Sequence, residues 1–234
     1  MSKRIRYPIR PGDQVKVLRD VECNTLLLDP PYSKRVHSGQ ASVRRPILYE
    51  PWDAATIRAF VDSWHERTLG WIVSFTSHDL IRAWQKAYER VGRYAFAPVI
   101  VLQKVPRLSG DGPANWARYL VNAPPPDPEI DDWISFMVAG RPRTADAARW
   151  RALPGAYNAP NERGAPIVGA KPVSLMRELV RDYSNVDDVV CDPCSGWGST
   201  RLAALSLGRR FVGAEIDKEL CEQANERPVP KCED

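Results

Sequence analysis

The chain has 234 residues, of which 44% are hydrophobic and 26% charged, and its formal net charge is +4. This composition predicts one α/β domain with a small insert, and it excludes a membrane-spanning chain, because no apolar run approaches the ~20 residues that such a helix needs. The N-terminus is basic but lacks the apolar core of a signal peptide. Since the five cysteines are scattered and odd in number, we expect a reduced, cytoplasmic protein without a disulfide framework or a bound metal.

The first elements of the chain lead to a short motif at the end of a strand. Asp13 is placed to cap a short helix over Gln14–Val21. The aliphatic run Leu26–Leu28 then predicts a strand buried on both faces, as in a parallel sheet. It ends in Asp29, Pro30, Pro31 and Tyr32. The prolines end the strand and hold the backbone extended, so we expect a rigid rim at the carboxyl end of the strand, where α/β sheets bind ligands.

This rim suits one particular kind of ligand. The Asp29 carboxylate and the Pro30 carbonyl offer two acceptors beside the flat ring of Tyr32. An exocyclic amino group on a planar base can donate two hydrogens to such a pair while the base stacks on the ring. Taken alone, the segment is equally compatible with a plain Pro-Pro turn after a buried strand.

The middle of the chain begins with a polar loop over residues 33–50. It carries four basic residues beside the rim, and these either contact phosphates or belong to a solvated loop. They are Lys34, Arg35, Arg44 and Arg45. Helices over 54–67, capped by Asp53, and 79–91 then alternate with strands over 71–75 and 97–102. This alternation predicts a doubly wound, mostly parallel sheet with helices on both faces.

A region of different composition follows over about 106–168. Residues 117–122 and 133–138 predict two shorter strands, which we expect to pair antiparallel at the edge of the sheet. Arginines, among them Arg141 and Arg143, are mixed with aromatic and amide residues from residue 139 onward. This mixture is typical of nucleic-acid contact, which we favour, and it also occurs in solvated inserts.

The last third of the chain predicts a nucleoside site. An amphipathic helix follows Lys171 and Pro172, and a strand over 189–191 leads to Asp192, Gly196 and Gly198 before a helix that begins near Ser199. Glycines let the backbone approach a ligand closely. The dinucleotide fingerprint fails, because its third glycine is replaced by Arg201. A second strand ends at Glu215, whose carboxylate can accept both hydroxyls of a ribose.

The two motifs together resemble the amino-methylating DNA methyltransferases, which methylate adenine N6 or cytosine N4. The segment from Asp29 to Tyr32 is similar to the catalytic Asp-Pro-Pro-Tyr motif of that family. The later segment is similar to its S-adenosylmethionine site. The resemblance assigns cofactor-binding roles to Asp13, Lys171, Asp192, Pro193, Gly196, Gly198, Thr200, Glu215 and Asp217. Two departures are Cys194, where the family usually has phenylalanine, and Gly169-Ala170, which replace its usual His-Pro-Thr.

The order of the motifs, catalytic first and cofactor last, is typical of the circularly permuted beta-type members of the family. The resemblance therefore implies a single Rossmann-like domain over 1–234 with a target-recognition insert at about 106–168. It implies S-adenosylmethionine as cofactor, double-stranded DNA as partner, and methylation of a flipped adenine at N6 without a metal. It places the protein on the nucleoid when bound to DNA, and it leaves open whether the protein belongs to a restriction-modification pair or acts alone. A homodimer is compatible with it, and the sequence identifies no partner nuclease.

Three other functions stay open at this point. Methylation of cytosine N4 needs the same fold and mechanism, and aspartate rather than serine at the head of the motif favours adenine within the family. A non-catalytic subunit that binds cofactor and DNA would have no need of the Asp29 carboxylate. A methyltransferase of protein glutamine would more naturally carry asparagine at that position.

Overall fold

The structure is a computed structural model that describes residues 9–34, 49–106, 130–143, 152–159, 165–167 and 169–231. The predicted strand over 117–122 and the basic residues Arg35, Arg44 and Arg45 lie outside the described residues. Within the described part, none of the helices is long and apolar enough to cross a bilayer.

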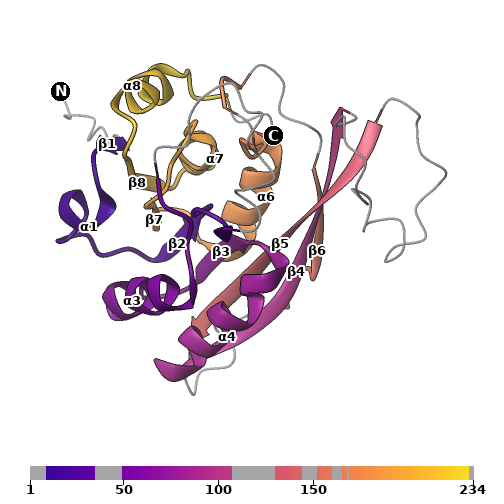
Figure 1. Cartoon of the computed structure of the whole chain (residues 1–234). Coiled ribbons are helices and arrows are strands. Elements are labelled where there is room, and N and C mark those ends of the chain that lie inside the picture. The colour runs from indigo at the N-terminus through magenta and orange to yellow at the C-terminus, as the bar shows by residue number, and fades with distance from the viewer. Residues whose placement is uncertain are drawn as a thin grey trace.

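The centre of the molecule is one eight-stranded sheet with the order β1-β8-β7-β2-β3-β5-β4-β6 (Figure 1). The first five strands in this order all run parallel to one another, whereas β5 runs antiparallel to both of its neighbours. The predicted mostly parallel sheet is therefore confirmed. The strands are β1 (Ile9–Pro11), β2 (Thr25–Leu28), β3 (Ile72–Thr76), β4 (Arg93–Pro106), β5 (Ile130–Pro142), β6 (Ala156–Ala159), β7 (Val189–Asp192) and β8 (Arg210–Glu215).

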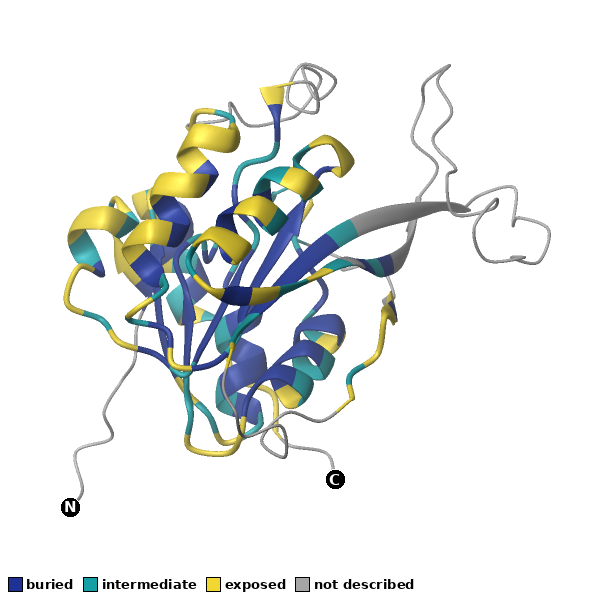
Figure 2. Cartoon of the chain, turned by 90° about the horizontal axis from the view of Figure 1, so that it is seen from below, coloured by how far each residue is buried: buried dark blue, intermediate teal, exposed yellow. Residues whose placement is uncertain are grey.

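Helices cover both faces of the sheet, and each face has its own apolar core (Figure 2). The helices are α1 (Gln14–Val17), α3 (Ala54–Trp64), the 3-10 turn η1 (His78–Leu80), α4 (Ile81–Arg90), α6 (Val173–Tyr183), α7 (Ser199–Ser206) and α8 (Lys218–Glu226). In β2, Leu27 packs into the core on the side of α6 and α7, while Leu26 and Leu28 pack on the side of α3 and α4. All three leucines are fully buried, which confirms the prediction of a strand covered on both faces.

The helix boundaries follow from local capping. Asp53 caps α3 as predicted, because its carboxylate accepts from the Thr56 N–H at 2.8 Å. The predicted helix over Gln14–Val21 is wrong in its length, since α1 ends at Val17. The reason is a long-range contact: the Arg67 guanidinium donates to the carbonyls of Leu18, Arg19 and Val21 at 2.8–3.2 Å, so these carbonyls need no helical partners.

The antiparallel pair is where the prediction of the sheet fails. Residues 133–138 belong to β5, which lies between β3 and β4 rather than at an edge, and the register joins Ser74 of β3 to Val138. β4 and β5 form a long antiparallel ribbon that reaches beyond the rest of the sheet (Figure 1). Two strands of the predicted insert, β5 and β6, are thus part of the framework. The role of the remainder in target recognition stays a prediction.

Candidate active site

Three carboxylates follow neighbouring parallel strands and therefore meet at one edge of the sheet. Asp29 follows β2, Asp192 ends β7, and Glu215 ends β8, and these strands are adjacent in the order β8-β7-β2. The charges of Asp29 and Glu215 contribute to a raised pKa of Asp192, as expected for acids that lie close together. The predicted catalytic and cofactor segments, about 160 residues apart in the chain, thus form one site.

The Asp29 carboxylate is held by two side chains. The Tyr32 hydroxyl donates to Oδ1 of Asp29 at 2.9 Å, and the Lys171 ammonium donates to Oδ2 at 2.5 Å. The sequence predicts Lys171 as a cofactor-binding residue and does not predict its contact with Asp29. A carboxylate offers about four lone-pair positions, so Asp29, whose side chain is 29% exposed, keeps acceptor capacity toward the outside.

The residues after Asp29 form the predicted rim. Pro30 is buried, and Pro31 and Tyr32 are half-buried. The carbonyl of Tyr32 accepts from the Trp52 N–H at 3.1 Å, which ties the rim to the segment that enters α3. Because its hydroxyl is bonded to Asp29, the orientation of the Tyr32 ring is set by the carboxylate beside it.

The loop between β7 and α7 is organised by Asp192. Its side chain is 3% exposed and accepts from the Cys194 N–H at 3.0 Å and from the Thr200 hydroxyl at 2.5 Å. Burial raises the pKa of Asp192 to about 7. The hydrogen bonds of Asp192 therefore fix the glycine-containing loop. Both Asp192 and Thr200 are predicted to bind cofactor, and in this structure they bind each other.

The raised pKa of Asp192 makes a testable prediction about stability. Between pH 4 and 7 the folded state keeps a proton that the unfolded chain has already released, so the free energy of unfolding falls as the pH rises through this window. In Asp192→Asn this loss, at most about 4 kcal/mol, should be absent. Urea unfolding of wild type and variant at several pH values from 4.5 to 7.5 measures the difference. A difference in the free energy of unfolding between the two proteins that stays constant with pH would contradict the raised pKa of Asp192. Asp20→Asn, at an exposed acid, is the control.

Glu215 is positioned by two backbone amides. The Gly196 N–H donates to Oε2 at 2.8 Å, and the Asp217 N–H donates to Oε1 at 2.9 Å. Burial is the main cause of a raised pKa of Glu215. The carboxylate stands half-buried at the end of β8 beside the glycine loop, so it can accept further hydrogen bonds from a ligand that lies across this loop.

The glycine loop has a backbone that most residues would strain. Gly196 has φ +49° and Gly198 has φ +76°, both in the left-handed region. The loop also packs closely on β8, where a Cβ at Gly213 would lie 2.2 Å from the Ser195 hydroxyl. Ser199, the first residue of α7, has a buried hydroxyl for which no hydrogen-bond partner is present among the described residues. A glycine turn, a helix N-terminus and a carboxylate acceptor fit a nucleoside with ribose hydroxyls.

Two other predicted cofactor residues act as helix caps. Asp13 accepts from the Val15 N–H at 2.9 Å, and Asp217 accepts from the Leu220 N–H at 3.1 Å. Asp13 nevertheless lies beside Glu215, since the Gly12 N–H donates to the Glu215 carbonyl at 2.8 Å. The structure thus brings Asp13 to the site as predicted, and a contact of its carboxylate with cofactor stays a prediction.

The structure does not bring all predicted DNA-binding residues to this edge. Arg141 and Arg143 contact Tyr94 near the beginning of β4, with guanidinium-to-ring distances of 4.9 and 4.4 Å. The pairing of Ile72 with Gly140 places this cluster beside the beginning of β3, at the opposite end of the parallel strands from Asp29. Lys34, in contrast, follows the rim directly and is exposed.

Two residues at the site escaped the sequence prediction. Desolvation is the main cause that raises the pKa of Tyr49 to about 12, and the negative charges of Asp29 and Glu215 add to it, so Tyr49 lies within electrostatic range of both carboxylates. Phe75 of β3 lies under the Lys171 ammonium, 4.8 Å from ring centre to Nζ. An aromatic residue at the end of a polar loop was the available signal for Tyr49. Phe75 looked like any core residue of a strand.

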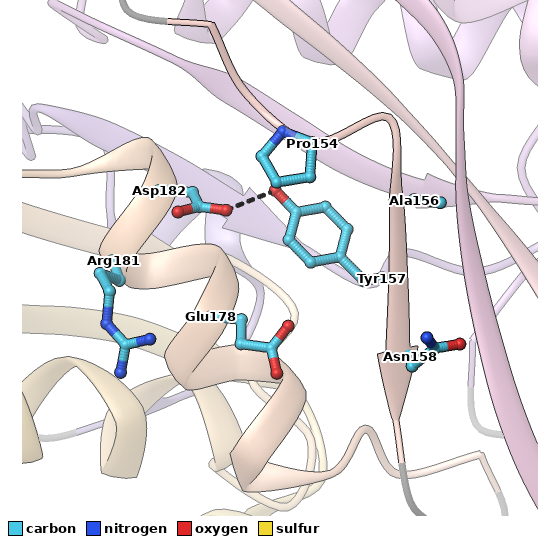
Figure 3. A pocket seen from close by; sticks show the side chains of 7 residues that line it. All are labelled: Pro154, Ala156, Tyr157, Asn158, Glu178, Arg181 and Asp182. Atoms are coloured by element: carbon cyan, nitrogen blue, oxygen red, sulfur yellow. Dashed lines mark hydrogen bonds between the residues drawn. The ribbon is translucent and has the colours of Figure 1, made fainter.

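A separate cavity of about 440 Å³ lies between β6 and the second half of α6 (Figure 3). The Tyr157 hydroxyl donates to Oδ2 of Asp182 at 2.8 Å at its wall. Its lining residues are Pro154, Ala156, Tyr157, Asn158, Glu178, Arg181 and Asp182. None of the predicted site residues is among them, so the cavity is distinct from the site formed by the three carboxylates.

Comparison with known proteins finds relatives that match parts of this chain. A family model described as DNA methylase matches residues 24–226. The chain is 41% identical over 56 residues to the orphan methyltransferase M.BamHII of Bacillus amyloliquefaciens, which is 24% of this chain and 21% of the relative. It is 39% identical over 49 residues to the DNA adenine methyltransferase YhdJ of Escherichia coli, which is 21% of this chain and 17% of the relative. Each match covers about a fifth of the relative's length.

Solved structures share the fold over most of the chain. The structure of M1.HpyAVI in complex with SAM has a TM-score of 0.63 at 17% identity and covers 93% of this chain and 96% of that one. The cytosine-N4-specific PvuII DNA methyltransferase has a TM-score of 0.56 at 15% identity, covering 92% and 83%. At these identities the similarity establishes the Rossmann-like fold, in agreement with the predicted fold class.

Proposed function

The chain belongs to the DNA methylase family, and from this membership we propose that it transfers a methyl group from S-adenosylmethionine to the exocyclic N6 of adenine in double-stranded DNA. The observation that carries the proposal is the juxtaposition of Asp29 with the glycine loop and Glu215 at one edge of the sheet. An acceptor for an amino group and an acceptor for a ribose belong together in a transfer between a base and a nucleoside cofactor.

The residues that would hold the cofactor are those of the β7–α7 loop and the end of β8. Glu215 would accept from the ribose hydroxyls, the glycines at 196 and 198 would let the ligand approach the main chain closely, and Asp13, which lies beside Glu215, would accept from the adenine amine. When bound, S-adenosylmethionine supplies an electrophilic methyl group on a sulfonium sulfur. Asp192 and Thr200 contribute by fixing the loop.

The residues of the rim would act on the target base. The base must leave the duplex, at a cost of about a few kcal/mol, because its amino group lies within the base stack. The outward lone pairs of Asp29 and the Pro30 carbonyl would accept the two amino hydrogens and localise the nitrogen lone pair, and Asp29 would take up the proton that the amine loses when it gains the methyl group. Positioning and electrostatic stabilisation account for the acceleration, and the chain needs no covalent intermediate.

Two features support DNA as the substrate and the base as adenine. Lys34 is exposed directly beside the rim, where a basic side chain can contact a phosphate of the strand that carries the flipped base. Aspartate at the head of the motif favours adenine within the family. The relative YhdJ is named as a DNA adenine methyltransferase, and the structural neighbour PvuII is named as cytosine-N4-specific, so cytosine N4 is the second candidate.

The test is methyl transfer from labelled S-adenosylmethionine to unmethylated duplex DNA, followed by digestion to nucleosides and mass spectrometry. We expect N6-methyladenine. N4-methylcytosine would keep the mechanism and overturn the base. Cofactor binding without a labelled nucleoside would overturn the proposed reaction in favour of a non-catalytic subunit or another substrate, and duplex RNA and protein offered in parallel separate these outcomes.

A further inference from the structure

The contacts of Lys171 point to a role that differs from cofactor binding. Its ammonium has three N–H donors, and three groups surround it: Oδ2 of Asp29 at 2.5 Å, the Gly169 carbonyl at 3.1 Å and the Tyr32 hydroxyl at 3.3 Å. The side chain is only 8% exposed. The three donors of the ammonium are thus matched by three protein acceptors in the described structure.

The direction from which Lys171 reaches Asp29 is equally informative. The ammonium lies 4.8 Å from the ring centre of Phe75, which is fully buried in β3. Lys171 therefore approaches the carboxylate from the interior of the protein. Asp29 is the more exposed partner of the ion pair, since 29% of its side chain is exposed against 8% of the Lys171 side chain. A substrate amine can reach the remaining lone pairs without displacing the lysine.

We propose that Lys171 is a positioning residue for Asp29. It fixes the carboxylate from the buried side, while Tyr32 fixes it from the side of the rim, so that the outward lone pairs point to the amino group of the target base. Because Lys171 directly precedes α6 and Asp29 follows β2, the ion pair also joins the cofactor half of the chain to the catalytic rim. This inference rests on the proposed function, since the amine it serves belongs to the proposed substrate.

The first experiment separates positioning from cofactor binding with Lys171→Met, which keeps the length of the side chain and removes its charge. At saturating cofactor and DNA we expect the single-turnover rate to fall about 100-fold, the size of effect that a misplacement of about 1 Å produces. The dissociation constant of the cofactor, measured by calorimetry, should change less than about twofold, since no cofactor contact is lost. Lys218→Met, an exposed lysine at the start of α8, is the matched control.

The second experiment asks whether an ammonium at this place is sufficient. In Lys171→Ala, added ethylammonium or propylammonium should restore the rate at least about tenfold, because a small amine can enter the space and pair with Asp29. The same amines should have no effect on Asp29→Ala, in which their partner is absent. A purely structural lysine would show a lowered melting temperature and no rescue.

The outcomes are distinguishable. An unchanged rate at saturating cofactor, together with a much weakened cofactor affinity, would overturn the positioning role and make Lys171 a cofactor ligand. Loss of the rate without rescue by amines would also overturn it. If the wild type methylates no nucleic acid while cofactor binds, the proposed function fails instead. A double-mutant cycle of Asp29→Asn and Lys171→Met in urea unfolding then still reports whether the two side chains are coupled.

Discussion

Asp29→Ala is expected to lower the methyl-transfer rate by roughly 10³-fold or more while the chain still binds S-adenosylmethionine. The Asp29 carboxylate is the partly exposed acceptor at the rim. Among the described residues no other acid lies between the end of β2 and the end of the rim at Tyr32. Without it the target amine keeps its hydrogens unpaired and its lone pair delocalised into the ring. The residues proposed to hold the cofactor, Gly196 and Glu215, are hydrogen-bonded to each other, so we expect cofactor binding to persist.

The design of this experiment must account for Lys171. Removal of Asp29 leaves an 8% exposed ammonium without its counter-ion, which costs several kcal/mol and can lower the amount of folded protein. Asp29→Asn keeps the volume and an oxygen acceptor, so it serves as the second variant. Calorimetric titration with cofactor shows that each variant is folded. Turnover by a folded Asp29→Asn within tenfold of wild type would refute the role of the carboxylate, and Asp20→Ala is the exposed control.

The site illustrates what local sequence can and cannot predict. Leu26–Leu28, Asp29 to Tyr32 and the glycine loop are contiguous stretches whose structure depends on nearby residues, and each was placed correctly as strand, rim or turn. Their meeting at one edge follows from parallel pairing, because parallel strands carry their carboxyl ends to the same side. The resemblance to a family added the roles, which the residues alone left open.

The parts that escaped prediction depend on contacts between distant residues. Lys171 and Asp29 are 142 positions apart, and nothing near Lys171 in the chain indicates a buried acid as its partner. The sequence of β5 predicts a short edge strand, yet β5 lies inside the sheet because it pairs with β3 over five residue pairs and with β4 over twelve. Such a register is a property of the whole sheet. The burial of Asp192 is likewise not visible in the sequence, although its partner Thr200 is near in the chain. A contact of Asp192 with cofactor stays a prediction.

Glu215→Gln is expected to weaken the binding of S-adenosylmethionine about 100-fold. A charged acceptor contributes about 1.5–3 kcal/mol for each hydrogen bond, and about 1.4 kcal/mol corresponds to a tenfold change in affinity. Glutamine keeps the size but presents an NH₂ group to one of the two amides that now point at the carboxylate, those of Gly196 and Asp217. The variant thus loses both the ribose acceptor and the order of the glycine loop. Glu222→Gln, an exposed acid on α8, is the matched control.

The pH dependence of cofactor affinity is a second, independent test of the role of Glu215. Burial raises the pKa of Glu215, so the carboxylate takes up a proton at a higher pH than an exposed glutamate does. Wild-type affinity should therefore fall as the pH is lowered through that raised pKa, because the protonated acid can accept fewer hydrogen bonds from the ribose. Glutamine carries no such proton, and the affinity of Glu215→Gln should lack this fall. Calorimetric titrations from pH 5 to 8 measure both proteins under matched conditions. Parallel pH profiles for wild type and Glu215→Gln would show that another group governs the pH dependence of binding. That result would refute the proposed contact of Glu215 with the ribose.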